Sequence, residues 1–547
     1  MEKRTIIAIL LIFVIYWVSS QFLWRPAVVE QEVGQNVERA HEQSTTAAIP
    51  VTRERPTFAE PEVYDSQFFG SLATIVNDRI ILENDSVSVS FTNRGALINQ
   101  ITLRNFYLLD KRTPVTLIPD EQAILQVHFQ NHVLASVNEV IFDYEIERRG
   151  DAQRLTFSID NPETGFVFRK IFTLGSGHSL GFYIEGENIP FFESYNVSMR
   201  SGINITEDSR AAVRGIGDQF RFIAQVDREG VSVTQSRLGR GEQTFSGRVN
   251  WAAVKSKYFV MSLIPESRIM TQSVRAQRVS ETLGFELFIN YNSRQSSIRD
   301  RYELYLGPVN HDLLRSFNIG KENIAESGMR WLRPLSRVFR FYIVFLYRFI
   351  PNYGLVIMFF AFTLKILLSP LTKKSLTAGR KMQKIQPLMR EIQAKYKNDP
   401  KKQQEELKRV YAEHKVNPLG GCLPILLQMP IFFALYPVLH TSIEFRQATF
   451  FGWLTDLSEP DPYWILPILM GCFMFLQQRM MQQKQDTSNM DEKQLAMVQS
   501  QKMMMYILPP FMVFIFSGLP SGLVLYWTTF NIFSIVQQYF LNKKQED

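Results

Sequence analysis

One lysine, Lys365, interrupts an apolar run that extends from Tyr353 to Leu368. If this run is a membrane-spanning helix, Lys365 lies about 18 Å along its axis, toward the basic segment that follows. A charge near mid-membrane costs roughly 2.5–3.5 kcal/mol, so it must face a wet cavity or a polar partner, or snorkel along its own stem toward the headgroups. Position alone leaves both interpretations open.

Other polar side chains lie within apolar runs and could surround this lysine. They are Gln428, Gln477, Gln478, Thr528, Thr529 and Asn531. If they converge with Lys365, they would line a hydrophilic recess. No acidic residue lies deep in any apolar run, which argues against a proton or sodium relay.

Residue types that carry other chemistry are sparse. The only two cysteines, Cys422 and Cys472, lie in apolar stretches and provide neither a disulfide framework nor a metal-ligand spacing. His128 and His132 form a close pair, but on a strand they would be roughly 13 Å apart, too far to share a metal ion. We therefore expect no catalytic residue, no metal site and no cofactor, in a protein that is not an enzyme.

The apolar segments that must position Lys365 are concentrated at the N-terminus and after about residue 340. The run Thr5–Leu23 follows two basic residues and lacks the small residues of a cleavage site, which predicts a retained membrane anchor within residues 1–25. Five more spans are expected at 353–368, 419–439, 463–478, 503–517 and 523–541. Basic loops alternate with an acidic one, and the pattern predicts six transmembrane helices with both termini in the cytoplasm.

The segment between the first two spans predicts a large domain outside the membrane. Residues 26–64 are rich in Glu, Gln, Thr, Ala and Pro and are expected to form a flexible linker. Residues 65–327 contain short alternating runs separated by Gly, Asn, Asp and Pro, which predict a β-sandwich of antiparallel strands. Examples are the runs 79–83, 87–92, 97–103, 154–159, 166–173, 180–185 and 258–263.

Residues 328–350 predict an amphipathic helix. Arg333, Arg337 and Arg340 fall at i, i+4 and i+7, which places them on one helical face with aromatic flanks. Such a helix suits the membrane interface, with its arginines at the lipid headgroups. A helix packed on the outer domain is the alternative.

Within a core expected at 351–541, residues 373–416 predict a cytoplasmic helical hairpin. Helices at 375–397 and 401–415 would be joined at Asn398-Asp399-Pro400, after a break at Ser369-Pro370. Their expected apolar seam consists of Met382, Ile385, Met389, Ile392, Tyr396, Leu407, Val410 and Tyr411. The basic exterior could bind anionic headgroups or ribosomal RNA, or reflect the positive-inside bias alone. The tail, 542–547, is short.

Several motifs in this half resemble the YidC family of membrane protein insertases, in the Oxa/Alb superfamily. They are Ser369-Pro-Leu-Thr372, Lys415-Val-Asn-Pro-Leu-Gly-Gly-Cys-Leu-Pro424, Gln428-Met-Pro-Ile-Phe-Phe-Ala-Leu-Tyr436, Ile465-Leu-Pro-Ile-Leu-Met-Gly471 and Leu519-Pro-Ser-Gly-Leu-Val-Leu-Tyr526. The resemblance covers roughly residues 340–541. The order of anchor, outer sandwich and five-span core is similar to the Gram-negative branch, in which the outer domain is periplasmic.

The resemblance implies a membrane insertase and chaperone of the bacterial inner membrane that acts in protein transport, Sec-independently and together with the Sec translocon. Family members offer a positively charged hydrophilic groove to the polar part of an incoming segment, while its apolar part leaves along an apolar slide. The implied partners are nascent membrane proteins, the Sec translocon, the ribosome through the 373–416 hairpin, and anionic lipids, but not DNA.

The motif match also implies roles for individual residues. It assigns the groove charge to Lys365 and the groove lining to Gln428, Gln478 and Trp527. It assigns the slide to Met429, Pro430, Met512 and Phe516. Many relatives carry Arg at the groove position, and a lysine keeps the charge but loses the bidentate geometry. Helix packing is the alternative role for the slide residues.

Two other functions stay open. A small-solute transporter would have internal repeats and paired broken helices, whereas the prolines at 430, 437, 509 and 510 do not pair between halves. A membrane-anchored periplasmic binding domain would instead place the activity in the sandwich.

Overall fold

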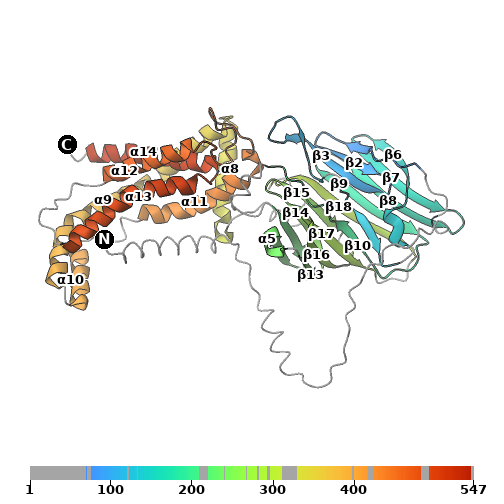
Figure 1. Ribbon diagram of the computed structural model, residues 1–547, viewed down its shortest axis with the longest axis horizontal. Coiled ribbons are helices and arrows are strands. Elements are labelled where there is room, and N and C mark those ends of the chain that lie inside the picture. Colours follow the sequence, from blue (N-terminus) through green and yellow to red (C-terminus); the bar gives the residue numbers. More distant parts are fainter. Residues whose placement is uncertain are drawn as a thin grey trace, which may run out of the picture. The chain divides into compact units, whose positions relative to one another are not determined.

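The computed structural model describes residues 69, 75–119, 122–131, 134–207, 220–239, 241–266, 268–279, 282–291, 296–310, 314, 329–396, 399–414, 416, 423–481 and 492–543. The chain divides into two compact units, one of strands and one of helices (Figure 1). The expected anchor at 1–25 and linker at 26–64 lie outside the described residues.

Three antiparallel sheets form the strand unit. The first has the order β1 (Ile80–Glu83), β2 (Val87–Thr92), β3 (Leu97–Tyr107), β4 (Pro114–Thr116). The second has the order β13 (Glu242–Ser246), β16 (Thr271–Val279), β17 (Thr282–Asn290), β10 (Ser194–Met199), β5 (Gln126–Phe129). The third has the order β12 (Glu229–Thr234), β11 (Arg221–Val226), β14 (Val249–Lys255), β15 (Phe259–Pro265), β18 (Ile298–Pro308), β9 (Ser179–Glu187), β8 (Phe166–Leu174), β7 (Ala152–Asn161), β6 (Asp143–Arg149).

One hydrophobic core joins the three sheets, and this confirms the predicted antiparallel sandwich. Strands such as β7 and β9 alternate buried and more exposed residues, because successive side chains point to opposite faces of a sheet. All seven residues of β15 are buried, and this strand lies between β14 and β18 in the largest sheet. A short helix, α5 (Gln235–Leu238), follows β12.

Residues Thr441–Gln447 belong to the sandwich unit although the helical unit flanks them in sequence. Phe445 is fully buried there. Arg446 donates through Nε to Glu207 over 2.7 Å and through a terminal nitrogen to the Tyr107 carbonyl over 2.8 Å. Both side chains of this ion pair are more than nine-tenths buried, so the segment is an integral part of the sandwich.

In the described part of the helical unit, α8 (Arg333–Tyr347) precedes α9 (Tyr353–Lys395). The predicted break at Pro370 was wrong, because α9 continues through both Pro370 and Pro387. A proline removes only one hydrogen bond of the helical ladder, so the bonds of the neighbouring turns can carry the helix past it. α9 packs against α8 and against α14 (Ser521–Lys543).

The predicted cytoplasmic hairpin has its counterpart in the second half of α9 and α10 (Pro400–Glu413). Asp399 caps α10 by accepting from the Lys402 amide, as expected for an aspartate before a proline at the first helical position. An apolar cluster joins the two helices through Ile385, Val410 and Val416, with Met382, Met389, Ile392 and Tyr411 packed against it. The seam prediction is confirmed for these residues other than Val416, which it did not include.

The remaining helices are α11 (Leu423–Thr441), α12 (Ile465–Met481) and α13 (Glu492–Phe516). α12 packs against both α13 and α14. Among the described residues, one helical segment, Tyr353–Lys373, is long and apolar enough to cross a membrane by length and composition alone. Ile465–Met480 and Met505–Phe516 are apolar but shorter.

A candidate polar site around Lys365

Lys365 points from α9 onto α14. Its ammonium Nζ donates to Ser534 Oγ over 2.7 Å and lies 4.6 Å from the centre of the Phe530 ring. The Ser534 hydroxyl in turn donates to the Phe530 carbonyl. Only 7% of Lys365 is exposed, so its charged end is held between two helices.

Among the described residues, Lys365 makes no ion pair. One hydroxyl and one ring face are weak compensation for a buried ammonium, which has three hydrogens to donate. The site therefore retains capacity to attract an additional acceptor or negative charge.

Further polar residues of α14 are buried, although among the described interactions no contact joins them, apart from Ser534, to Lys365. Thr528, Thr529, Asn531, Ser534 and Gln538 are all buried. The sequence analysis included Thr528, Thr529 and Asn531 but missed Ser534 and Gln538. Asn531, Ser534 and Gln538 are spaced at i, i+3 and i+7, and this helical periodicity could have revealed them.

The predicted groove-lining residues have different partners. Gln428 of α11 is buried and donates through Nε2 to the Tyr526 hydroxyl over 2.9 Å. Gln478 of α12 is partly exposed. Lys365 and Gln428 therefore both bond to α14, Lys365 at Ser534 and Gln428 at Tyr526. These two positions of α14 are eight residues apart in sequence.

Trp527 lies in an aromatic cluster that joins three helices. Its ring centre is 5.7 Å from that of Phe432 on α11 and 5.3 Å from that of Phe516 on α13. Phe516, predicted as a slide residue, is thus buried between helices, whereas Met429, Pro430 and Met512 are partly exposed.

The three predicted interfacial arginines all lie in α8. Arg337 is exposed, while Arg333 and Arg340 are partly buried. The residues buried on this helix are Phe339, Ile343 and Leu346, and Phe339 packs edge-on against Phe360 of α9. Val338, Phe341 and Phe345 of the same helix are exposed, and Phe341 most of all at 73%.

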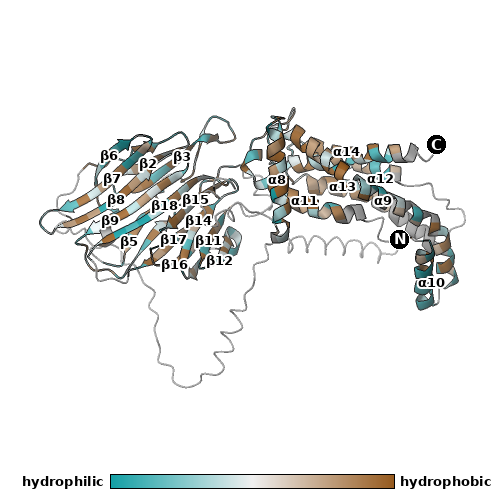
Figure 2. Ribbon diagram, turned by 180° about the vertical axis from the view of Figure 1, so that it is seen from behind, coloured by the Kyte–Doolittle hydropathy of each residue, from teal (hydrophilic) through white to brown (hydrophobic). Residues whose placement is uncertain are grey.

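Large apolar side chains are exposed on several helices of this unit. Phe341, Phe359, Leu367, Ile468, Tyr506, Phe514 and Phe540 are among them. Figure 2 shows α8 as largely hydrophobic and α10 as hydrophilic. An apolar exterior on this scale is typical of a surface that contacts lipid or another protein.

Comparison with known proteins identifies both units. Residues 345–547 match the family model described as 60Kd inner membrane protein, and residues 79–332 match the model of the YidC periplasmic domain. A protein of Geotalea daltonii named membrane protein insertase YidC is 30% identical over 99% of both chains. One of Syntrophus aciditrophicus with the same name is 28% identical over the full length of both.

A solved structure described as an active YidC insertase with its first transmembrane domain resolved is 19% identical, with a TM-score of 0.34, and covers 87% of this chain and 96% of its own. The assignment rests on the sequence matches, which span both units of the chain. This chain therefore belongs to the YidC family of inner membrane proteins.

Proposed function

We propose that the protein is a membrane protein insertase and chaperone of the bacterial inner membrane, acting alone and beside the Sec translocon. The observation that carries the proposal is similarity over nearly the whole chain to proteins named as insertases. The apolar exterior of the helical unit supports a place in the membrane. The six-span topology, with both termini in the cytoplasm and the sandwich in the periplasm, is part of the proposal.

Lys365 supplies the positive charge that attracts the polar, acidic part of an incoming segment. Its burial against Ser534 and Phe530 supports this role, because a snorkelling lysine would extend toward the headgroups rather than onto a neighbouring helix. Thr528, Thr529, Asn531 and Gln428 supply further hydrogen-bonding groups nearby on α14 and α11. The groove thus lowers the cost of moving polar groups through the bilayer.

The apolar part of the segment leaves along α11 and α13. Met429, Pro430 and Met512 are accessible enough to contact it, and the flexible methionines suit a surface that accepts many sequences. Phe516, held between Phe432 and Trp527, keeps these helices together.

Other partners contact the basic parts of the molecule. Arg333, Arg337 and Arg340 contact anionic headgroups, and the exposed lysines of α10, such as Lys401 and Lys402, contact headgroups or the ribosome. Both interactions should weaken as salt increases.

The decisive experiment replaces the native protein in depleted cells with wild type, Lys365→Arg, Lys365→Ala or Lys365→Glu. Insertion of a small phage-coat-like protein is scored by protease protection. We expect Arg to restore insertion, Ala to weaken it and Glu to abolish it. Lys373→Ala, an exposed lysine on the same helix, is the matched control. Equal insertion by all variants would remove the groove charge from the mechanism, and loss of solute uptake instead of insertion would indicate a transporter.

A further inference from the structure

The strand β6 forms one edge of the largest sheet, with β7 as its neighbour (Figure 1). It has seven residues and is the longest edge strand of the three described sheets. The other edge strands are β1, β4, β5, β12 and β13. An edge strand carries backbone N–H and C=O groups that can pair with another chain, unless the protein itself covers them.

Two of the other edges are covered by side-chain carboxamides. Gln153 accepts from the Glu83 amide of β1 over 3.3 Å and donates to the Glu83 carbonyl over 2.6 Å. Asn138 bonds Val127 of β5 in the same way, accepting over 3.0 Å and donating over 2.9 Å. In both cases one carboxamide takes the place of a neighbouring strand.

The backbone groups of β6 that point away from β7 are those of Tyr144, Ile146 and Arg148. The hairpin between β6 and β7 has two turn residues, so the flanking Arg149 and Ala152 form a hydrogen-bonded pair. Hydrogen-bonded and non-bonded pairs alternate along an antiparallel ladder. The even-numbered residues of β6 therefore direct their N–H and C=O groups outward.

The chain pairs with this edge up to the start of β6 and then stops. Phe142 donates through its amide to the Asn93 carbonyl over 2.9 Å, and its own carbonyl accepts from Asn93 Nδ2 over 3.2 Å. Among the described residues, none bonds the outward groups of Tyr144, Ile146 or Arg148. A strand added to β6 would continue a pairing that the chain itself begins.

Exposed apolar side chains flank the open edge. Tyr144 and Ile146 are 42% and 41% exposed, and the Tyr144 ring lies 6.2 Å from that of the buried Phe157, measured between centres. Ile75 is 78% exposed and lies beside the start of β6, because Asn93 Nδ2 also donates to the Ile75 carbonyl. An added strand would cover Tyr144 and Ile146 with its own alternate side chains.

The other face of β6 carries a row of three carboxylates, Asp143, Glu145 and Glu147. Glu147 lies 3.1 Å from Arg149 and is paired across the sheet with Arg154, an exposed residue of β7. Arginines therefore offset the charge at this end of the row.

Glu145, in the middle of the row, has a different neighbour, since Thr156 is opposite it on β7. At the far end of the row, Arg94 bridges Ile141, two residues before Asp143, and lies on the same face. Glu145 thus makes no ion pair among the described residues. A lysine or arginine directly opposite it on an added strand would strengthen the pairing.

The acidic row also distinguishes between possible occupants of the edge. Two copies of β6 paired antiparallel about Ile146 would place Glu145 of each copy against Glu147 of the other. Like charges directly opposite one another destabilise a sheet. The edge therefore favours a strand of a different polypeptide over a second copy of this chain.

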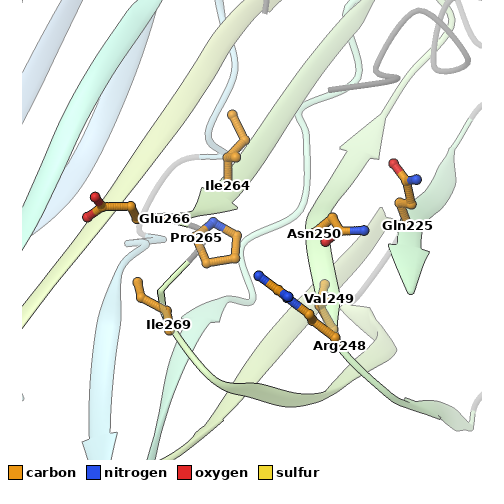
Figure 3. Close-up of a pocket in the computed structure, with 8 residues that line it drawn as sticks. All are labelled: Gln225, Arg248, Val249, Asn250, Ile264, Pro265, Glu266 and Ile269. Atoms are coloured by element: carbon orange, nitrogen blue, oxygen red, sulfur yellow. The ribbon is translucent and has the colours of Figure 1, made fainter. Parts of the chain in front are cut away.

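A cavity of about 360 Å³ lies elsewhere in the same sheet, at the ends of β11, β14 and β15 (Figure 3). Two of its carboxamides are already bonded within the sheet, since Gln225 accepts from Trp251 Nε1 and Asn250 donates to the Asp227 carbonyl. Four strands, β18, β9, β8 and β7, separate these strands from β6. Pairing at β6 does not involve this cavity.

We propose that β6 receives an extended segment of a partner polypeptide as an added strand, bonded to the outward backbone groups of Tyr144, Ile146 and Arg148. The segment has apolar residues opposite Tyr144 and Ile146 and a basic residue opposite Glu145. The site lies within the sandwich and involves none of the groove or slide residues. The inference can therefore be tested separately from the insertase function.

The test uses the purified full-length protein in detergent and the fluorescein-labelled peptide Ser-Thr-Val-Lys-Val-Thr-Ser, with binding followed by anisotropy. The two valine N–H groups would face β6, so methylating both nitrogens should reduce affinity by about tenfold or more. The lysine N–H would face away from β6. A peptide methylated at that nitrogen is the matched control and should retain most of the binding.

Two protein variants test the other side of the contact. Ile146→Pro removes an outward N–H but no bond to β7, so affinity should decrease by about tenfold, whereas Ile146→Val keeps the N–H and should bind normally. Glu145→Lys should weaken the lysine peptide by about two- to fivefold and strengthen its glutamate counterpart by a similar factor. A loss of structure would not produce this exchange of preference.

Three results would overturn the proposal: equal binding to wild type and Ile146→Pro, equal binding of the valine-methylated peptide, or no binding at millimolar concentration. Self-association that Ile146→Pro abolishes in sedimentation, without peptide binding, would assign the edge to a second copy instead. An unchanged thermal unfolding midpoint shows that a variant keeps its fold. If Ile146→Pro lowers that midpoint, the methylated peptides still decide, because they are measured on the wild-type protein.

Discussion

Two buried lysines, one in each unit, meet different environments. Lys170 of β8 is fully buried and donates to the carbonyls of Gly95, over 2.7 Å, and Leu125, over 3.3 Å. These acceptors lie just before β3 and just before β5, so one amino group of β8 links segments next to strands of the other two sheets. Lys365 has a single hydroxyl and a ring face.

The two lysines differ in how fully their amino groups are bonded, and this difference distinguishes a structural role for Lys170 from the functional role that we propose for Lys365. Gly95, Ala96 and Leu125 have positive φ values, so the strands around Lys170 hold unusual backbone conformations in place to present these carbonyls. A buried lysine whose amino group already donates to rigid backbone acceptors has little to offer a ligand. Lys365 is bonded to one rotatable hydroxyl, and the proposed function requires it to exchange that partner for an incoming acidic group.

The largest effect is expected where a charge of the sandwich loses its partner. Arg446→Met leaves the Glu207 carboxylate buried, which should cost about 3–5 kcal/mol and lower the melting point of the sandwich by about 6–20 °C. Thermal unfolding of the full chain, followed by the β-sheet signal, measures it. The double variant with Glu207→Gln should recover much of the loss, and Arg154→Met is the surface control. If Arg446→Met is as stable as wild type, the Arg446–Glu207 pair does not hold the segment 441–447 in place.

The second effect is a pH dependence from Lys170. Burial lowers the pKa of this lysine to about 7, from 10.5. Between these values the unfolded chain holds a proton that the folded chain does not, so wild-type stability should rise with pH from about 7 to 10.5, by a few kcal/mol at most. Lys170→Met should show a smaller rise than wild type when unfolding midpoints are measured across the range.

Two other groups must be separated from Lys170 in that experiment. His128 is close enough to Lys170 to feel its charge, and burial lowers the pKa of His128 to about 4. Its effect on stability is therefore confined to the range from pH 6.5 down to about 4, where stability decreases as the pH falls. Lys255, also buried with a pKa of about 7, should contribute in the same window and remain in the variant. Identical pH profiles of wild type and Lys170→Met would show that Lys170 keeps an ordinary pKa.

The sequence predicted the sandwich because its strands carry a local signal. β2 was predicted with its observed bounds, Val87–Thr92, since alternation has a period of two residues and turn residues flank the run. The helix ends were less predictable. α13 begins at Glu492 rather than near 503, because its first turns are polar and an apolar-run criterion excludes them.

The candidate site was predictable in its charge and in some of its buried polar residues, but not in the partner of the charge. A lysine inside an apolar run is conspicuous, whereas Ser534 is not, since a helical serine commonly bonds its own helix. Its pairing with Lys365 depends on how α9 packs against α14, which no local pattern specifies. The Arg446–Glu207 pair, 239 residues apart, is beyond local inference for the same reason.

The smallest effect should come from Ser534→Ala, and it sharpens the comparison of the two lysines. Removing this hydroxyl deletes one hydrogen bond to a charged group, worth about 1.5–3 kcal/mol at most, while leaving the Lys365 charge in place. If the charge acts on substrate, insertion should stay within about twofold of wild type, whereas Lys365→Ala weakens it strongly. Protease protection of the same phage-coat-like substrate measures both variants. A loss of insertion in Ser534→Ala as severe as in Lys365→Ala would mean that Lys365, like Lys170, is a structural link between elements, and the positive groove would lose its main support.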